Sequence, residues 1–517
     1  MSDTERKKPV STNGDGLRVE SGEVDSGTAD QLLVSLGYTP ELSRNRSTLQ
    51  VAFMSFVLAS IPYGLATTLY YPLVGGGPVT IIWGWVAISA IILCVAASLG
   101  EITSVYPTAG GVYYQTFMLA PPGWRHIAAW TCGWLYVVGN VTITLAVNFG
   151  TTLFLVGCIN VFETADGEAV FAGEPYQVFL IFLGITLLCN AVSSLGNRWL
   201  PILDTFAIFW TFAGVIAIVA CVLAIAKEGR RDANWVFTHF EVNSGWTPGW
   251  SFFVGLLHAA YATSSTGMII SMCEEVREPA TQVPKAMVLT ICINTVAGLL
   301  FMIPLVFVLP DIEGLILLAQ PVPAIIKSAV GNSGGAFGLL IPLLVLAIIC
   351  GIGCTTATSR CIYAFARDGA IPGSKWWKQI NHKLDDVPFN AMMLSMVVQI
   401  VLGAIYFGSS AAFNAFSGVG VIALTASYAT PIVVSMIDGR RTVRTGSFYL
   451  GSIGWFCNIV STCWSLLAIP LFCMPTTVPV TDPALMNYAS VVFVGFVAIA
   501  GGWYLAWGRK HYTGPPT

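Results

Sequence analysis

Long apolar stretches alternate with short polar segments along almost the whole chain after residue 48. A helix needs about 20 apolar residues to cross the hydrocarbon core of a bilayer. On that scale the pattern predicts an all-α integral membrane protein with twelve membrane-spanning helices. Their approximate bounds are 49–74, 79–100, 127–158, 176–195, 201–226, 250–273, 286–309, 336–364, 389–407, 412–437, 448–472 and 487–508.

The first and the sixth of these stretches are each interrupted in the middle. The interruptions are Ser60-Ile61-Pro62-Tyr63-Gly64 and Thr263-Ser264-Ser265-Thr266-Gly267. A helix broken in lipid leaves backbone groups unpaired, which is tolerated only where they line a cavity or bind something. Paired interruptions in two halves of a chain are typical of secondary transporters. Because the interrupted spans are the first and the sixth, we expect two repeats of five spans in opposite orientation, a 5+5 inverted repeat, followed by two extra helices.

The same pattern divides the chain into six segments. They are a polar tail (1–48), a first repeat (49–226), an extracellular loop (227–249), a second repeat (250–437), helices eleven and twelve (438–508) and a C-terminal tail (509–517). The composition of the first tail is typical of disorder and not of a cleavable signal peptide. We expect helices eleven and twelve to serve as a scaffold or as the contact of a homodimer.

The distribution of positive charge predicts the orientation in the membrane. With the N-terminus in the cytosol, sixteen lysines and arginines fall at inner loops and helix ends, and four fall at outer ones. This asymmetry obeys the positive-inside rule, and it predicts that both termini are cytosolic.

Composition excludes several other classes of protein. Hydrophobic residues make up 55% of the chain and charged residues only 10%, against roughly 25% in soluble domains. The net charge of −3 gives no indication of a nucleic-acid partner. The 13 cysteines show no metal-ligand spacing, so we expect neither a metal nor a cofactor. The motifs HExxH and GxxxxGK[ST] are absent, and we therefore do not expect an enzyme.

The residues at the two interruptions are the first candidates for a substrate site. Freed amides at Ile61–Gly64 carry a partial positive charge that suits a carboxylate, although a simple proline kink is the alternative. Carbonyls freed in span six suit an ammonium group, which Tyr261 would face through a cation–π contact. The expected substrate-binding residues are Ile61, Pro62, Tyr63, Gly64, Tyr136, Asn140, Tyr261, Thr263, Ser264, Ser265, Gly267 and Phe416. Helix packing is the alternative role for the hydroxyl residues and for Phe416.

Charged residues gather at the predicted cytosolic ends of several spans. Paired there, they would lock an inner gate and reopen it during a transport cycle. The predicted gate residues are Glu101, Glu274, Glu275, Arg360 and Arg367. Anchoring at the lipid headgroups is the alternative role.

Three motifs in this order resemble the amino acid–polyamine–organocation (APC) superfamily. Glu101–Tyr113 is similar to its E-x-x-S-x-Y-P-x-[AS]-G-G-x-Y motif, Glu274–Ala286 to E-E-x-x-x-P-x-x-x-x-P-x-A, and Phe365–Pro372 to A-R-D-G-x-[IL]-P. Asp30–Leu33 and Leu36–Arg44 resemble the fungal amino acid/choline permease branch. The resemblance implies a LeuT-type fold and import of amino acids, γ-aminobutyrate, choline or related amines across the plasma membrane.

The resemblance also suggests where coupling takes place. Proton-coupled relatives often carry a lysine in span five, and this chain has Trp210 near that position. An aromatic residue there favours an amine or choline-like ligand, so Trp210 joins the expected substrate-binding residues. In sodium-coupled relatives, hydroxyls of span eight help to bind the ion. The expected coupling or ion residues are His258, Asp204, Thr355, Thr358 and Ser359, the first two because ionisable groups inside spans are costly. The alternatives are a place in the extracellular vestibule for His258, a cytosolic gate or a bond to a helix end for Asp204, and hydroxyl-rich helix packing for the three span-eight residues.

Three functions therefore remain open. The first is a permease that imports a small amino acid or amine such as γ-aminobutyrate with a proton as co-substrate. The second is a choline or organic-cation carrier driven by membrane potential. The third is a nutrient sensor that binds its ligand without moving it.

Overall fold

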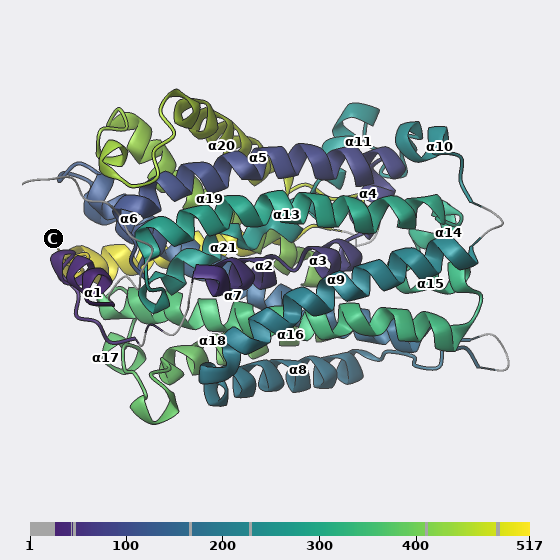
Figure 1. Ribbon diagram of the computed structural model, residues 1–517, viewed down its shortest axis with the longest axis horizontal. Coiled ribbons are helices and arrows are strands. Elements are labelled where there is room, and N and C mark those ends of the chain that lie inside the picture. Colours follow the sequence, from purple (N-terminus) through teal and green to yellow (C-terminus); the bar gives the residue numbers. More distant parts are fainter. Residues whose placement is uncertain are drawn as a thin grey trace, which may run out of the picture.

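The computed structural model describes residues 26–42, 44, 48–164, 168–226, 230–408, 412–481 and 486–516. In these ranges the protein is an elongated bundle of helices, and its β-structure amounts to two isolated bridges (Figure 1). Twelve helical segments there are long and apolar enough to cross a membrane. The prediction of a twelve-span, all-α membrane protein is therefore confirmed.

The long elements follow the predicted order. They are α2 (Thr48–Ala59) with α3 (Ile61–Thr67), α5 (Pro78–Val105), α7 (Arg125–Ile159), α8 (Pro175–Leu195), α9 (Leu200–Ile225), α11 (Pro248–Gly255) with α12 (Leu257–Thr263) and η2 (Ser264–Glu275), α13 (Pro279–Phe307), α16 (Ser333–Arg367), α18 (Phe389–Gly403), α19 (Ala412–Ile437), α20 (Ser452–Leu471) and α21 (Ala489–Trp503). The seventh span begins earlier than predicted. Pro279 opens α13 as a first-turn residue whose missing N–H costs nothing there.

Short helices cover the two ends of the bundle. At one end lie α1 (Ser26–Ser35), α6 (Gly111–Leu119), α17 (Ser374–Trp377) and the C-terminus, and we call this the terminal end (Figure 1). At the other end lie α10 (Ala233–Thr238), α14 (Ile312–Leu315) and α15 (Pro321–Val330).

The two interrupted spans are the most buried of the twelve. The apolar windows of Leu49–Thr67 and Pro248–Glu275 are 78% and 94% buried, whereas that of Ala489–His511 is 6% buried. The interrupted spans contact each other through α2 with η2 and α3 with α12, and both contact α16. They therefore form the centre of the bundle, and α21 lies at its periphery.

The segment before the first span differs from the prediction of a disordered tail. Ser26–Ser35 forms α1, and Leu33, Tyr38 and Leu42 are buried against the bundle. Composition alone favours disorder here, but contacts with distant helices supply the burial that orders the segment. Residues 1–25 of the predicted tail lie outside the described residues.

Candidate substrate site and terminal gate

The helix of the first span is interrupted at a single residue. Ser60 separates α2 from α3 with φ 39° and ψ 51°, and its hydroxyl donates to the Val57 carbonyl. Pro62 has no N–H, so it cannot bond to the Leu58 carbonyl four residues earlier. Ile61–Thr67 is helical, and the interruption is therefore narrower than the five residues predicted.

The sixth span is tightened at its interruption, where the sequence predicts a break. The α-helix ends at Thr263 and continues as the 3₁₀-helix η2. Ser264 Oγ donates to the Tyr261 carbonyl at 2.7 Å, and Thr266 Oγ1 donates to the Thr263 carbonyl at 2.6 Å. These bonds reach back three residues, as do the backbone bonds of a 3₁₀-helix.

The two interruptions are joined directly. Ser265 Oγ donates to the Leu58 carbonyl at 2.7 Å, and Cys350 Sγ of α16 lies 3.7 Å from the same oxygen. Gly64 faces Ala262 so closely that a Cβ added there would lie 3.2 Å from the alanine Cβ. The carbonyl that Pro62 leaves without a helical donor is thus satisfied from span six and span eight.

Two phenols from other spans bind the carbonyls of η2. Tyr136 Oη of α7 donates to the Gly267 carbonyl at 3.2 Å, and Tyr428 Oη of α19 donates to the Ser264 carbonyl at 3.0 Å. A Cβ on Gly267 would fall 2.5 Å from the Tyr428 ring, so only glycine fits at this position. The expected residues Tyr136, Ser264, Ser265 and Gly267 therefore meet at one place.

Several buried polar atoms on the sixth span, α7 and α16 have no hydrogen-bond partner among the described residues. They are Tyr261 Oη, His258 Nε2, Asn140 Oδ1, Asn148 Oδ1 and Thr355 Oγ1. A buried polar atom without a partner costs free energy and is rare in folded proteins. Five such atoms on the central spans and their neighbours α7 and α16 mark a region suited to a polar ligand.

The remaining hydroxyls of span eight take part in helix packing. Thr358 Oγ1 lies 2.8 Å from Thr144 Oγ1 and 3.2 Å from the Asn140 carbonyl. Ser359 Oγ donates to the Thr356 carbonyl at 2.7 Å. Of the three hydroxyl residues expected to bind an ion, Thr355 alone has a buried oxygen without a partner among the described residues.

The two ionisable residues within spans occupy different places. His258 is buried in α12, and its ring contacts the backbone of Leu65 in α3. Asp204 is buried in α9 and lines a small cavity with Met54 and Leu58 of α2. Each therefore lies beside one half of the interrupted first span.

Some expected residues do not point to the meeting place. Tyr63 Oη bonds to the Val147 carbonyl at 2.8 Å and to Thr151 Oγ1 at 2.9 Å, and the buried Phe416 belongs to the main apolar core. Trp210 was expected near the interruption, but it is half-exposed and its Nε1 donates to the Pro342 carbonyl of α16 at 3.2 Å. Ala207 of α9 packs against Val57 of α2 and Ile349 of α16.

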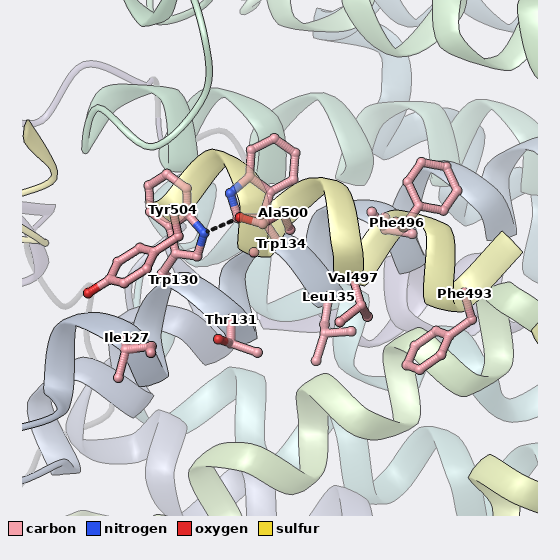
Figure 2. A pocket seen from close by; sticks show the side chains of 12 residues that line it. Ile127, Trp130, Thr131, Trp134, Leu135, Phe493, Phe496, Val497, Ala500 and Tyr504 are labelled. Carbon is pink, nitrogen blue, oxygen red and sulfur yellow. Dashed lines mark hydrogen bonds between the residues drawn. The ribbon is translucent and has the colours of Figure 1, made fainter. Parts of the chain in front are cut away.

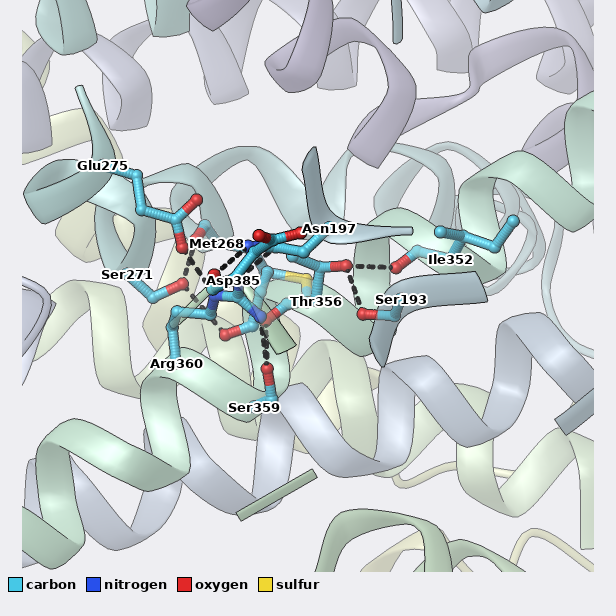
Figure 3. A network of polar contacts seen from close by, with 11 residues as sticks. Ser193, Asn197, Met268, Ser271, Glu275, Ile352, Thr356, Ser359, Arg360 and Asp385 are labelled. Carbon is cyan, nitrogen blue, oxygen red and sulfur yellow. Dashed lines mark hydrogen bonds and ion pairs between the residues drawn. The ribbon is translucent and has the colours of Figure 1, made fainter. Parts of the chain in front are cut away.

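The predicted gate residues form ion pairs at the terminal end. Glu274 Oε1 lies 2.8 Å from Arg367 Nη2, and Glu275 Oε1 lies 2.7 Å from Arg360 Nε. Arg360 also donates to Asn197 Oδ1 at 2.8 Å, and Asn197 donates to the Asp385 carbonyl at 2.9 Å (Figure 3). The pairs join η2 to α16 as expected, whereas nothing in the sequence pattern singles out Asn197.

Glu101 does not belong to this group. It binds Arg440 after α19, with 2.6 Å between Oε1 and Nη2, and it accepts a bond from the Leu450 backbone at 2.8 Å. Both side chains of this pair are buried, so Glu101 links span two to spans ten and eleven.

The three sequence motifs meet at the terminal end. The Ala109 backbone N–H donates to Glu274 at 3.1 Å, and Tyr113 Oη donates to Asp368 Oδ2 at 2.8 Å. Burial raises the pKa of Asp368 to about 6, against the lowering effect of its neighbour Arg367. Asp368 belongs to the A-R-D-G motif, which is the signal that sequence reasoning passed over.

An apolar groove between α7 and α21 is separate from this region. Aromatic side chains dominate its walls, and Trp130 Nε1 donates to the Ala500 carbonyl at 3.1 Å (Figure 2). Since α21 is the least buried span, the groove opens to the membrane-facing surface. None of the expected substrate-binding residues lines it.

Twelve membrane spans, two joined interruptions at their centre and ion pairs at one end define a membrane transport protein. The sequence matches the amino acid permease family model over residues 47–498, and the chain belongs to that family. Similar proteins include the amino-acid permease BAT1 of Arabidopsis thaliana, 30% identical, with 95% of this chain and 96% of the relative covered. The GABA-specific permease of Saccharomyces cerevisiae is 30% identical (94% and 86% covered), and the choline transporter of the same yeast is 29% identical (91% and 83% covered).

Proposed function

We propose that the protein is a plasma-membrane permease that imports a small amino acid or amine such as γ-aminobutyrate by alternating access. The observation that carries this proposal is the direct bond between the two interruptions, Ser265 Oγ to the Leu58 carbonyl at 2.7 Å. Substrate bound there contacts both repeats at once, so its binding can change how they pack.

The chemistry of the site supports a zwitterionic ligand. Neither Tyr261 Oη nor Asn140 Oδ1 has a partner among the described residues; the phenol is a donor suited to a carboxylate, and the amide oxygen is an acceptor suited to an ammonium group. Both side chains are buried, which excludes water and strengthens such bonds. A ligand that binds to Tyr261 and to Asn140 in this way carries both a carboxylate and an ammonium group.

Proton coupling is assigned to His258 and Asp204. His258 is the buried histidine beside α3, and its imidazole is a group that can bind and release a proton. Asp204 lines the cavity beside Leu58, whose carbonyl closes the first interruption. Protonation at either place changes the charge next to an interrupted helix, which is the element that must move.

The terminal end is the cytosolic gate in this proposal. The pairs Glu274–Arg367 and Glu275–Arg360 hold η2 to α16 and close the site on that side. The excess of lysines and arginines near the predicted inner ends supports this orientation, with both termini in the cytosol. A homodimer through the peripheral helices α20 and α21 belongs to the same proposal.

A choline or organic-cation carrier is the second candidate. Span five contains no lysine or arginine and carries Asp204, so a permanent cation meets no repulsion there. Tyr261 offers a ring face for a quaternary ammonium group. Trp210 no longer supports this candidate, because it lies against Pro342.

Uptake tests separate these candidates. Permease-deficient yeast that express the chain are assayed with labelled γ-aminobutyrate, neutral amino acids and choline at pH 5 and pH 7.5, with and without a protonophore. We expect amino acid uptake that increases at pH 5 and is abolished by the protonophore. Choline uptake that follows membrane potential alone would favour the second candidate. Ligand binding without flux, at normal surface expression, would identify a sensor and contradict the proposal.

A further inference from the structure

The segment before the first span is fastened across the terminal end by side chains from two central spans. Tyr38 Oη donates to Asp368 Oδ2 at 2.9 Å, just beyond α16, and Tyr363 Oη of α16 donates to Glu41 at 2.5 Å. Arg44 Nη1 donates to the Val276 carbonyl at the end of η2, also at 2.5 Å. Each of these bonds joins the segment before the first span to α16 or η2, or to the residue that directly follows one of them. Both helices carry gate residues.

The C-terminal residues are fastened to the same end by other contacts. Tyr512 is buried, and its ring lies 5.1 Å from that of Trp130 in an edge-on arrangement. The Thr513 carbonyl lies 3.1 Å from His126 Nε2. Gly514 has φ +80°, and a Cβ there would lie 2.4 Å from the Phe117 ring, so glycine is required.

The segment before the first span and the C-terminal residues meet on α6, and they touch each other there. Tyr114 Oη of α6 donates to the Leu36 carbonyl at 3.2 Å, while Phe117 of α6 packs against Gly514. Gly37 lies so close to Pro516 that an added Cβ would be 2.7 Å from the proline Cβ. Figure 1 shows the C-terminus beside α1. We call residues 26–44 and 512–516 the terminal clasp.

The clasp covers one of the two gate ion pairs. The Arg367 guanidinium carbon lies 3.9 Å from the centre of the Tyr38 ring while Arg367 is paired with Glu274. The ring therefore stacks on the charged group and keeps water from that face of the pair. Water would weaken the pair by raising the local dielectric constant.

We propose that the terminal clasp holds the terminal end of the bundle closed and must release before the site opens to that side. This inference rests on the alternating-access function proposed above, since it assigns the clasp to one half of that cycle. The bonds of Tyr38, Glu41 and Arg44 attach to α16 and η2, so these two helices cannot separate at this end while the bonds persist.

The buried thiol of Cys273 in η2 reports on opening. Its side chain is fully buried, and it lies one residue before Glu274 of the gate. Labelling of Cys273 by a maleimide, followed at the level of the peptide by mass spectrometry in open membrane fragments, gives the fraction of time for which this end is open. The readout does not depend on which substrate is transported.

Two variants loosen the clasp from opposite ends. Tyr38→Phe removes one hydroxyl and keeps the ring, and deletion of residues 512–517 removes the C-terminal half. We expect each to increase the rate of Cys273 labelling about fivefold, the factor expected for one net hydrogen bond. Because the two halves touch each other at Gly37 and Pro516, loosening one also weakens the other, and the double variant should gain less than the product of the two single effects. Tyr176→Phe, an exposed phenol at the start of α8, is the matched control and should change nothing.

Labelling of Cys273 at the wild-type rate in both variants, at normal membrane abundance, would overturn the clasp. So would fully multiplicative effects, which indicate two independent contacts. If the variant that lacks residues 512–517 does not reach the membrane, the labelling rate of Tyr38→Phe alone tests the proposal. Faster labelling in a chain that transports none of the tested substrates would support the clasp and refute the proposed transport function.

Discussion

Ser265 of span six donates its hydroxyl hydrogen to the carbonyl of Leu58 in span one at 2.7 Å. That carbonyl is available because Pro62 cannot supply the helical N–H. The proline of one repeat and the serine of the other therefore form a single unit, and neither interruption can move without affecting this bond.

Replacing Ser265 by alanine tests this unit. Without the hydroxyl, the weak Cys350 thiol is the donor that remains beside the Leu58 carbonyl. Leaving a buried acceptor unsatisfied in this way lowers the free energy of unfolding by about 1–3 kcal/mol. We expect a lower melting temperature and at least a severalfold lower uptake rate. Ser461→Ala is the matched control, because this buried hydroxyl bonds within its own helix to the Cys457 carbonyl. Equal effects of the two substitutions would contradict the special role of Ser265.

The Glu275–Arg360 pair should separate stability from gating. Glu275→Gln leaves Arg360 buried with a neutral partner, and breaking such a pair costs about 3–5 kcal/mol. Replacing both residues, as Glu275→Leu with Arg360→Met, should recover most of the melting temperature while transport stays impaired.

The Glu101–Arg440 pair provides the control for this experiment. It is equally buried but lies outside the η2–α16 contact. The corresponding double replacement, Glu101→Leu with Arg440→Met, is expected to keep transport wherever the protein remains stable. Full transport by the Glu275→Leu/Arg360→Met variant would show that the pair is structural only.

Asp368 makes the terminal end sensitive to pH. Burial raises its pKa from 3.8 to about 6, so the closed arrangement binds a proton more readily than one with a hydrated carboxyl. Acid therefore favours closure fully below 3.8, and this preference is lost as pH rises through 6. The groups that face Asp368 are Tyr38, Tyr113, Tyr114, Arg367, Glu274 and Tyr512.

The ratio of Cys273 labelling in the wild type to that in Asp368→Asn checks this dependence, since thiol chemistry cancels in the ratio. The asparagine variant imitates the protonated carboxyl and should stay closed throughout. We expect the ratio to be near one at pH 5 and to increase toward pH 7.5. A constant ratio across this range would count against Asp368 as the titrating group.

The sequence predicts those features that depend on local residue types. Uninterrupted apolar length gives the twelve spans, and Pro62 together with the hydroxyl residues after Tyr261 gives both interruptions. Opposite charges at the ends of spans six and eight indicate ion pairs there, without assigning Arg367 to Glu274 or Arg360 to Glu275. In each case the signal lies within one helix or one turn.

Features set by contacts between distant segments were not predictable in this way. The partner of Glu101 is Arg440, 339 residues away, and nothing in the local pattern singles it out. Trp210 was expected beside the first interruption, but its indole donates to the Pro342 carbonyl of α16, 132 residues away, and nothing in the local pattern indicates that contact. The order of the segment around Tyr38 depends on Asp368, which lies 330 residues later.

Tyr261 should distinguish the two candidate substrates. Its hydroxyl has no partner among the described residues, so Tyr261→Phe should leave the melting temperature unchanged, whereas Tyr63→Phe loses two bonds and should lower it. If the substrate is an amino acid, the hydroxyl binds its carboxylate, and Tyr261→Phe should increase KM about fivefold or more. If the substrate is choline, the ring face is what matters, and Tyr261→Phe should change KM less than about twofold while Tyr261→Leu increases it severalfold. The comparison uses uptake kinetics of both substrates at matched surface expression. Unchanged KM for both substrates in Tyr261→Leu would remove Tyr261 from the substrate site.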